Sequence, residues 1–143
     1  MPTEAARHGH TQHSALRQRI ARLDEGWRRY RQDISDTQIR DGLIQRFEFT
    51  YEISHKTLKR YLEYASANPA AFDHMTFQDL IRTANEQGLL LGNWGDWKQY
   101  RDMRSRTSHT YDEATALAVV QGIEKFLAEA VFLHRTLQSK LAE

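Results

Sequence analysis

The chain has 143 residues, of which 40% are hydrophobic, a size and composition typical of one folded domain that buries its own core. Its 20 Lys and Arg residues nearly balance 19 Asp and Glu residues, so the net charge of +1 indicates neither a nucleic-acid coat protein nor an acidic one. The absence of cysteine excludes a disulfide scaffold, a thiolate zinc site and a cysteine nucleophile. Any chemistry must therefore come from other side chains.

The polar character of the sequence predicts a cytoplasmic protein that does not enter a membrane. No apolar run approaches the ~20 residues that a membrane-spanning helix needs. The N-terminal residues are polar and lack the apolar core of a secretory signal. Residues 1–13 are predicted to form a flexible polar tail, and residues 14–143 a single helical domain.

The first two predicted helices occupy the N-terminal half of the chain. Prolines occur only at positions 2 and 69, which favours helices throughout. The first helix is predicted over residues 14–34 from apolar side chains spaced three and four apart, namely Leu16, Ile20, Leu23, Trp27, Tyr30 and Ile34. The second helix is predicted to start at a capping-box pattern, Ser35 with Gln38. It is predicted to end at about Ala67, because the following Asn68-Pro69 pair disfavours helix.

Two shorter helices are predicted to follow. Thr76 is the expected N-cap of the third, which continues to about Gln87 before Gly88 ends it. The fourth is expected after Asn93, and its Trp94 and Trp97, one turn apart, are interpreted as core residues.

The last predicted helix starts near Asp112 and runs almost to the end of the sequence. Thr110 and Glu113 form a second capping-box pattern at its start. Five helices and no alternating strand pattern predict an all-α fold, an up-and-down bundle of four to five helices. The periodic apolar residues of the last helix are Ala116, Val120, Ile123, Leu127, Val131 and Leu137.

The segment over residues 101–112, between the last two helices, is the candidate functional segment. On one continuous helix, Arg104 and His109 would lie about 140° apart, too far round to act on one small group. The Ser and Thr residues between them favour a break in the helix, which would let both side chains face one cleft.

These residue types suit RNA cleavage without a metal or any other cofactor. His109 can move a proton near neutral pH, and Arg104 can bind phosphate oxygens and stabilise the charge of the transition state. Arg101 and Arg106 would hold the RNA backbone. In the alternative interpretation, Arg104 pairs with an acidic neighbour and His109 is a structural turn residue. Glu52, His55 and Lys56 occupy neighbouring positions of the second helix and could line the cleft, but they are interpreted as part of a solvated face of this long helix.

The spacing Arg104-x4-His109-x-Tyr111 resembles the R-x4-6-H motif of the HEPN superfamily, in the form found in HepT toxins and nucleotidyltransferase substrate-binding proteins. Residues 45–62, QRFEFTYEISHKTLKRYL, resemble the second helix of the same subfamily. One position departs from the pattern, since Ser105 follows the motif arginine where Asn, Asp or His is usual.

The resemblance implies a homodimeric helical bundle in which Arg104 and His109 of both subunits line a shared cleft. It implies an endoribonuclease toxin that cuts RNA, such as tRNA or mRNA, within a type VII-like toxin-antitoxin pair. The partner would be a small MntA-like nucleotidyltransferase that neutralises the toxin by adding AMP to Tyr111, where charge and bulk would block the RNA path.

Two other functions remain open at this point. One is a non-catalytic subunit that docks on the nucleotidyltransferase and binds nucleotide or phosphate through Arg104, with Ser105 as a supporting polar group. The other is a plain helical dimerisation protein, which leaves the arginine, histidine and tyrosine spacing unexplained.

Overall fold

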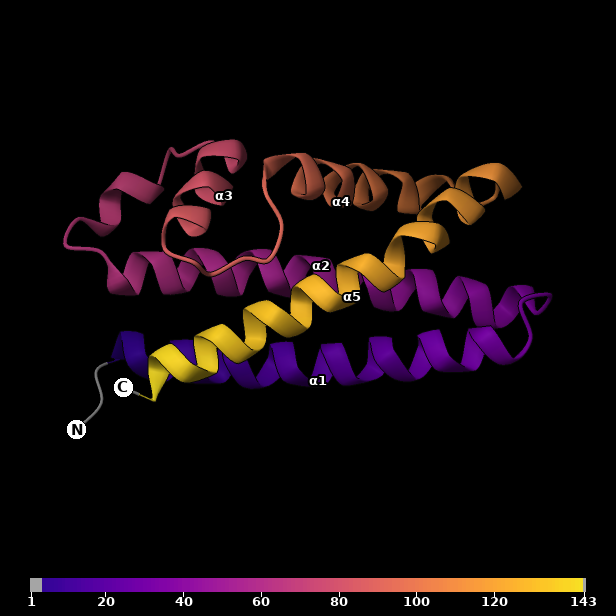
Figure 1. The fold of residues 1–143 in the computed structure, drawn as a ribbon, viewed down its shortest axis with the longest axis horizontal. Helices are drawn as coiled ribbons and strands as arrows, with labels where there is room; N and C mark the ends of the chain where they lie inside the picture. The colour runs from indigo at the N-terminus through magenta and orange to yellow at the C-terminus, as the bar shows by residue number, and fades with distance from the viewer. Residues whose placement is uncertain (1–3, 143) are drawn as a thin grey trace.

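The computed structural model describes residues 4–142, with side chains from residue 13 onward. This part of the chain is built only from helices and connecting turns, which confirms the all-α prediction (Figure 1). None of the helices between residues 4 and 142 combines the length and the apolar character of a membrane-spanning segment. The elements in chain order are α1 (Glu4–Gln32), α2 (Thr37–Ala65), the 3-10 helix η1 (Pro69–Phe72), α3 (Phe77–Glu86), α4 (Trp94–Arg106), the 3-10 helix η2 (Thr107–His109) and α5 (Glu113–Leu141).

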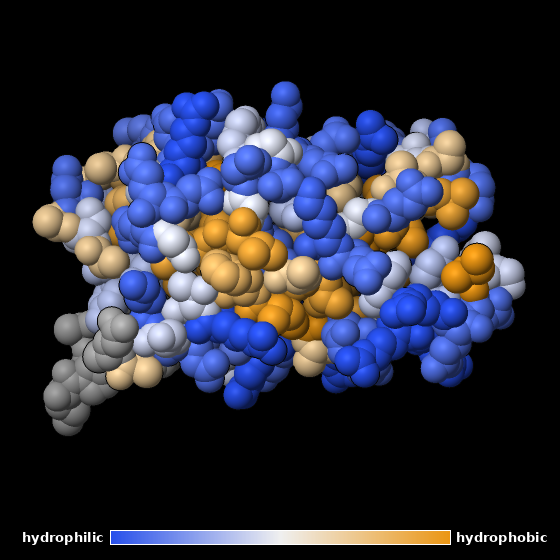
Figure 2. All heavy atoms as spheres, viewed as in Figure 1, coloured by the Kyte–Doolittle hydropathy of each residue, from blue (hydrophilic) through white to orange (hydrophobic). Residues whose placement is uncertain are grey.

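The bundle is organised around three long helices. α1 and α2 form an antiparallel pair, α5 crosses both of them, and α4 packs against α2 and α5 (Figure 1). Edge-to-face aromatic contacts join α2, α4 and α5, with ring centroids 5.1 Å apart for Phe47 and Phe126 and 5.2 Å apart for Tyr100 and Phe126. Hydrophilic side chains dominate the face drawn in Figure 2, around a hydrophobic patch at its centre. The aromatic core therefore fixes where α4 lies on α2.

Several predicted helix ends are confirmed and others are corrected. Thr76 caps α3, and Gly88, with φ of 71°, follows its end, as expected. α1 begins at Glu4, so the predicted tail is already helical from that residue on, while residues 1–3 lie outside the described part. α2 is capped by Asp36 instead of Ser35, since the Asp36 carboxylate accepts a hydrogen bond from the Ile39 amide at 3.1 Å.

The predicted capping box at the start of α5 is wrong. Asp112, not Thr110, is the N-cap, and its carboxylate accepts hydrogen bonds from the amides of Ala114 and Thr115. Glu113 instead pairs with Arg40 of α2 at 2.6 Å, because the buried guanidinium of Arg40 needs a carboxylate partner. This ion pair holds the beginning of α5 against the beginning of α2.

One predicted apolar position lies outside the core. Ile34 is 71% exposed, because α1 ends at Gln32 and leaves it in the turn. On α5, Leu127 is partly buried and packs against the core, Val131 is half-buried, and the other predicted positions are buried. Phe126 and Ala130, which the pattern did not include, are buried beside them.

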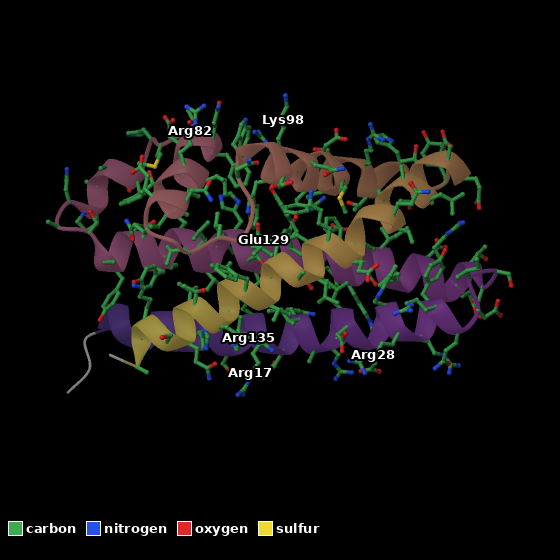
Figure 3. All side chains as sticks on the ribbon, in the orientation of Figure 1. Arg17, Arg28, Arg82, Lys98, Glu129 and Arg135 are labelled. Atoms are coloured by element: carbon green, nitrogen blue, oxygen red, sulfur yellow. The ribbon has the colours of Figure 1, made fainter. Side chains whose placement is uncertain are left out.

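One buried carboxylate, Glu129 on α5, fixes the start of α4 (Figure 3). It accepts hydrogen bonds from the backbone amides of Leu91 and Gly92, both at 2.7 Å, and from the Trp97 indole at 2.9 Å. A capping box between Asn93 and Asp96 then begins the helix. These contacts set the position of α4, and with it the position of the functional segment.

Candidate functional site

Arg104 lies on the last turn of α4, and the α-helix ends two residues later, as the sequence predicts. Thr107 stabilises this end, because its hydroxyl donates a hydrogen bond to the Arg104 carbonyl at 2.7 Å. The same hydroxyl oxygen accepts a hydrogen bond from Arg104 Nη1 at 3.1 Å. The residue that stabilises the end of α4 therefore also orients the Arg104 side chain.

Two carboxylates of α2, one helical turn apart, hold the guanidinium of Arg104. Glu52 Oε1 accepts from Nη2 at 2.5 Å and from Nε at 3.2 Å, and Glu48 lies 3.3 Å from Nη2. The hydrogen bond to Glu52 raises the pKa of Arg104, so the guanidinium stays charged. A phosphate that binds Arg104 would have to compete with these carboxylates.

Arg104 opens onto a cavity of about 520 Å³ between α2 and α4. Ser105 and Arg101, two of the predicted supporting residues, line the same cavity, and the Arg101 guanidinium lies 5.6 Å from the Phe77 ring centroid. The full lining consists of Tyr51, Glu52, His55, Lys56, Phe77, Arg101, Arg104 and Ser105. Three cations and one carboxylate thus surround a space that can hold a phosphate with its attached groups.

The α2 residues of this cavity were assigned by sequence to a solvated face. Glu52, His55 and Lys56 occupy neighbouring positions of one helix face, and this face turns toward α4. The His55 ring lies edge-to-face on Phe77, with centroids 4.8 Å apart. Burial lowers the pKa of His55, and the charges of Lys59 and Arg101 lower it further. His55 is therefore a neutral imidazole at neutral pH, beside Arg104.

His109 and Tyr111 lie apart from this cavity within one chain. Neither contributes to its lining; both are exposed, Tyr111 to 88%, and their ring centroids are 6.1 Å apart in an edge-to-face arrangement. Arg106, also predicted to bind phosphate, instead pairs with Asp102 at 3.1 Å. The single chain therefore brings Arg101, Arg104 and Ser105 to one cavity, and the other three predicted residues lie outside its lining.

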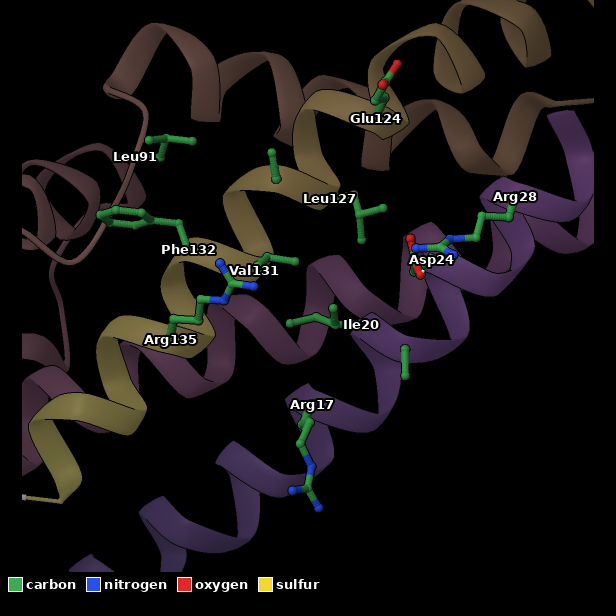
Figure 4. Close-up of a pocket in the computed structure, with 12 residues that line it drawn as sticks. Arg17, Ile20, Asp24, Arg28, Leu91, Glu124, Leu127, Val131, Phe132 and Arg135 are labelled. Carbon is green, nitrogen blue, oxygen red and sulfur yellow. Dashed lines mark ion pairs between the residues drawn. The ribbon is translucent and has the colours of Figure 1, made fainter.

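A larger groove of about 720 Å³ runs between α1 and α5 (Figure 4). Its floor is formed mainly by aliphatic and aromatic side chains, with Arg17 and Arg135 at one end and an Asp24–Arg28 ion pair at the other. Such a lining suits contact with an apolar surface more than acid–base chemistry. No group of His, Asp and Glu residues suited to a metal ion occurs in the part of the chain that was described.

Comparison with known proteins identifies the family of this chain. Residues 11–139 match the family described as nucleotidyltransferase substrate binding protein like. A Haemophilus influenzae protein named probable ribonuclease HepT is 38% identical over 127 residues, which cover 88% of this chain and 86% of the relative. A solved structure from Haemophilus influenzae is also similar, with 34% sequence identity and a TM-score of 0.69, and the match covers 93% of this chain and 98% of that one. It is described as revealing the fold of a substrate binding domain of a nucleotidyltransferase. The family match includes every residue that lines the Arg104 cavity.

Proposed function

The chain belongs to the nucleotidyltransferase substrate binding protein like family and is similar to a protein named probable ribonuclease HepT. From this premise we propose that it is a metal-independent endoribonuclease of the HepT kind. The observation that carries the proposal is the charged arginine at the mouth of a cation-lined cavity, next to a segment that holds an exposed imidazole. The family description also implies a nucleotidyltransferase partner.

The proposed reaction needs only side chains of the protein. The ribose 2′-oxygen attacks the adjacent phosphorus and loses its proton, a 2′,3′-cyclic phosphate forms, and the bond to the 5′-oxygen breaks as that oxygen gains a proton. His109 moves a proton in this reaction, since an imidazole exchanges protons near neutral pH. Arg104 stabilises the negative charge that builds on the phosphate oxygens. Arg101 and Ser105 support the phosphate in the same cavity.

The proposed active unit is a homodimer. His109 does not line the Arg104 cavity of its own chain, so the two residues would act together if His109 of a second copy approached that cavity. A twofold arrangement would then produce two equivalent sites in one shared cleft.

The proposed control is the addition of AMP to Tyr111 by an MntA-like nucleotidyltransferase. The phenol oxygen would attack the α-phosphorus of ATP, pyrophosphate would leave, and the phenol proton would go to solvent or a base. The exposure of Tyr111 and its place beside His109 support this role. The added nucleotide brings negative charge and bulk to the RNA path.

A second function, a non-catalytic subunit that binds nucleotide for the transferase through Arg104, is favoured by one observation. Ser105 provides a hydroxyl where the motif usually has an amide, carboxylate or imidazole. This departure would reduce cleavage without preventing phosphate binding in the cavity.

Cleavage of total RNA and tRNA in the presence of EDTA tests the proposal. We expect the wild type to leave 2′,3′-cyclic phosphate ends, and Arg104→Ala and His109→Ala each to lower the rate by about 10²- to 10³-fold. His74→Ala, which removes an exposed histidine far from the motif in sequence, is the matched control and should cleave normally.

Absence of cleavage by the wild type at high protein concentration would contradict the enzyme and favour the second function. Incubation with the nucleotidyltransferase and ATP then gives an independent result. Mass spectrometry should find AMP on the wild type and not on Tyr111→Phe.

A further inference from the structure

A row of cations on α2 leads away from the Arg104 cavity. Lys59 and Arg60 follow Lys56 by three and four residues, so the three side chains share one helix face. They line a second cavity, of about 560 Å³, together with Glu63. Lys56 lines both cavities, so the two spaces meet at this residue.

The charges of this row are not neutralised by ion pairs. Between residues 13 and 142, carboxylates pair with Arg28, Arg40, Arg104, Arg106 and Lys125, but none pairs with Lys56, Lys59 or Arg60. The row therefore presents three positive charges against one carboxylate, that of Glu63. Uncompensated cations in a line are the usual electrostatic footprint of a nucleic-acid backbone.

We propose that Lys56, Lys59 and Arg60 bind the phosphates of a single-stranded RNA that continues from the Arg104 cavity along α2. The proposal rests on the proposed function, because it assigns the path of the RNA on one side of the bond that is cut. Residues 52 to 63 span roughly 16 Å of helix at 1.5 Å per residue, enough for a few nucleotides.

The cavity favours an unpaired strand over a duplex. The Arg101 guanidinium lies over the Phe77 ring, 5.6 Å from its centroid, and His55, Trp94 and Trp97 pack around that ring, so the exposed Arg101 is the plane in the cavity wall on which a base can stack. Aromatic rings and arginine planes bind the faces of unstacked bases, which a duplex does not offer. Contacts to phosphates alone carry no sequence information, so binding along the row should be insensitive to sequence and sensitive to salt.

The test measures binding separately from cleavage. Fluorescence anisotropy is recorded over a series of salt concentrations with a labelled 2′-O-methyl RNA, which lacks the attacking hydroxyl and stays intact. The variant Lys59→Gln/Arg60→Gln removes two charges of the row. The variant Arg31→Gln/Lys140→Gln removes two exposed charges from α1 and α5 and is the matched control.

We expect the row variant to bind the RNA several-fold more weakly at low salt. The plot of the logarithm of the association constant against the logarithm of the salt concentration should become less steep by about 1.4, or ~0.7 for each lost phosphate contact. The control should keep both the wild-type affinity and slope. Lys56→Gln should lower the slope by about half as much. Circular dichroism establishes that each variant has the wild-type helical content.

The outcomes separate this proposal from the proposed function. Equal affinity and slope for the row variant and the control, with RNA cleavage intact, would overturn the path along α2 and leave the ribonuclease standing. Weaker binding by the row variant in a protein that cleaves no RNA would retain the path and overturn the catalytic function. Failure of the wild type to bind the RNA at low salt would overturn both.

Discussion

Arg104 is the residue at which the sequence and the structure give complementary information. The motif spacing identifies it, and the structure adds that Glu52 and Glu48 bind its guanidinium from another helix. Of the alternative interpretation, the pairing of Arg104 with an acidic neighbour is therefore present, and the same side chain also opens onto a cavity with two further cations, which a phosphate can bind.

Replacement of Glu52 by glutamine should strengthen RNA binding. The substitution keeps the size of the side chain and removes the negative charge that competes with phosphate for Arg104. An exposed ion pair of this kind is worth up to about 1 kcal/mol, so we expect the Kd to fall by about fivefold. The measurement is anisotropy with the uncleavable RNA.

Asp102→Asn is the control for Glu52→Gln, because it also removes a carboxylate paired with an arginine, Arg106, but lies outside the cavity. It should leave the Kd near the wild-type value. Weaker RNA binding by Glu52→Gln would contradict competition and would show that Glu52 orients Arg104 for its ligand.

At the scale of elements, the position of α4 depends on a single carboxylate of α5. Glu129 accepts two backbone hydrogen bonds from the turn before α4 and one from Trp97 within it. Burial raises the pKa of Glu129, and these hydrogen bonds oppose that shift. No motif marks this residue in the sequence, because its three donors lie over 30 positions away.

Replacement of Glu129 by leucine should lower the free energy of unfolding by about 3 kcal/mol, since it leaves the buried Trp97 indole and two part-buried backbone amides without an acceptor. Urea denaturation followed by circular dichroism measures this loss. Glu124→Leu, at an exposed position five residues earlier on α5, should change the free energy by less than about 0.5 kcal/mol. An equally small effect of both substitutions would contradict the role assigned to Glu129.

At the scale of the whole molecule, the separation of His109 from the Arg104 cavity makes subunit mixing informative. Arg104→Ala and His109→Ala are each expected to cleave about 10²- to 10³-fold more slowly than the wild type when alone. If each site takes its arginine from one copy and its histidine from the other, a mixed dimer regains one intact site. Random mixing should then restore roughly a quarter of the wild-type rate.

The mixing experiment uses subunits denatured together and refolded, with RNA cleavage in EDTA as the readout. Each variant refolded alone is the control and should keep its low rate. No recovery in the mixture, with dimers demonstrated by light scattering, would show that both residues act within one chain.

The sequence by itself determined the features that depend on local interactions. Helix periodicity and breakers such as Asn68-Pro69 and Gly88 specify an all-α chain and several helix ends, because caps and φ preferences act within a few residues. Competing caps one position apart, as at Ser35 and Asp36, are nearly equal in energy, and here Asp36 caps the helix while the amide and hydroxyl of Ser35 donate to the Asp33 carboxylate. The motif spacing also identified Arg104, His109 and Tyr111 as candidates.

Only the tertiary structure decided which of these residues meet. The pairing of Arg104 with Glu52 joins positions 52 residues apart, and it depends on how α4 packs across α2. The aromatic core and Glu129 set that packing, and they bring Lys56 and His55 to the cavity while leaving His109 outside it. Helix periodicity indicates which residues share a face of a helix. Which neighbouring helix this face packs against is decided by the fit of side chains from distant parts of the chain.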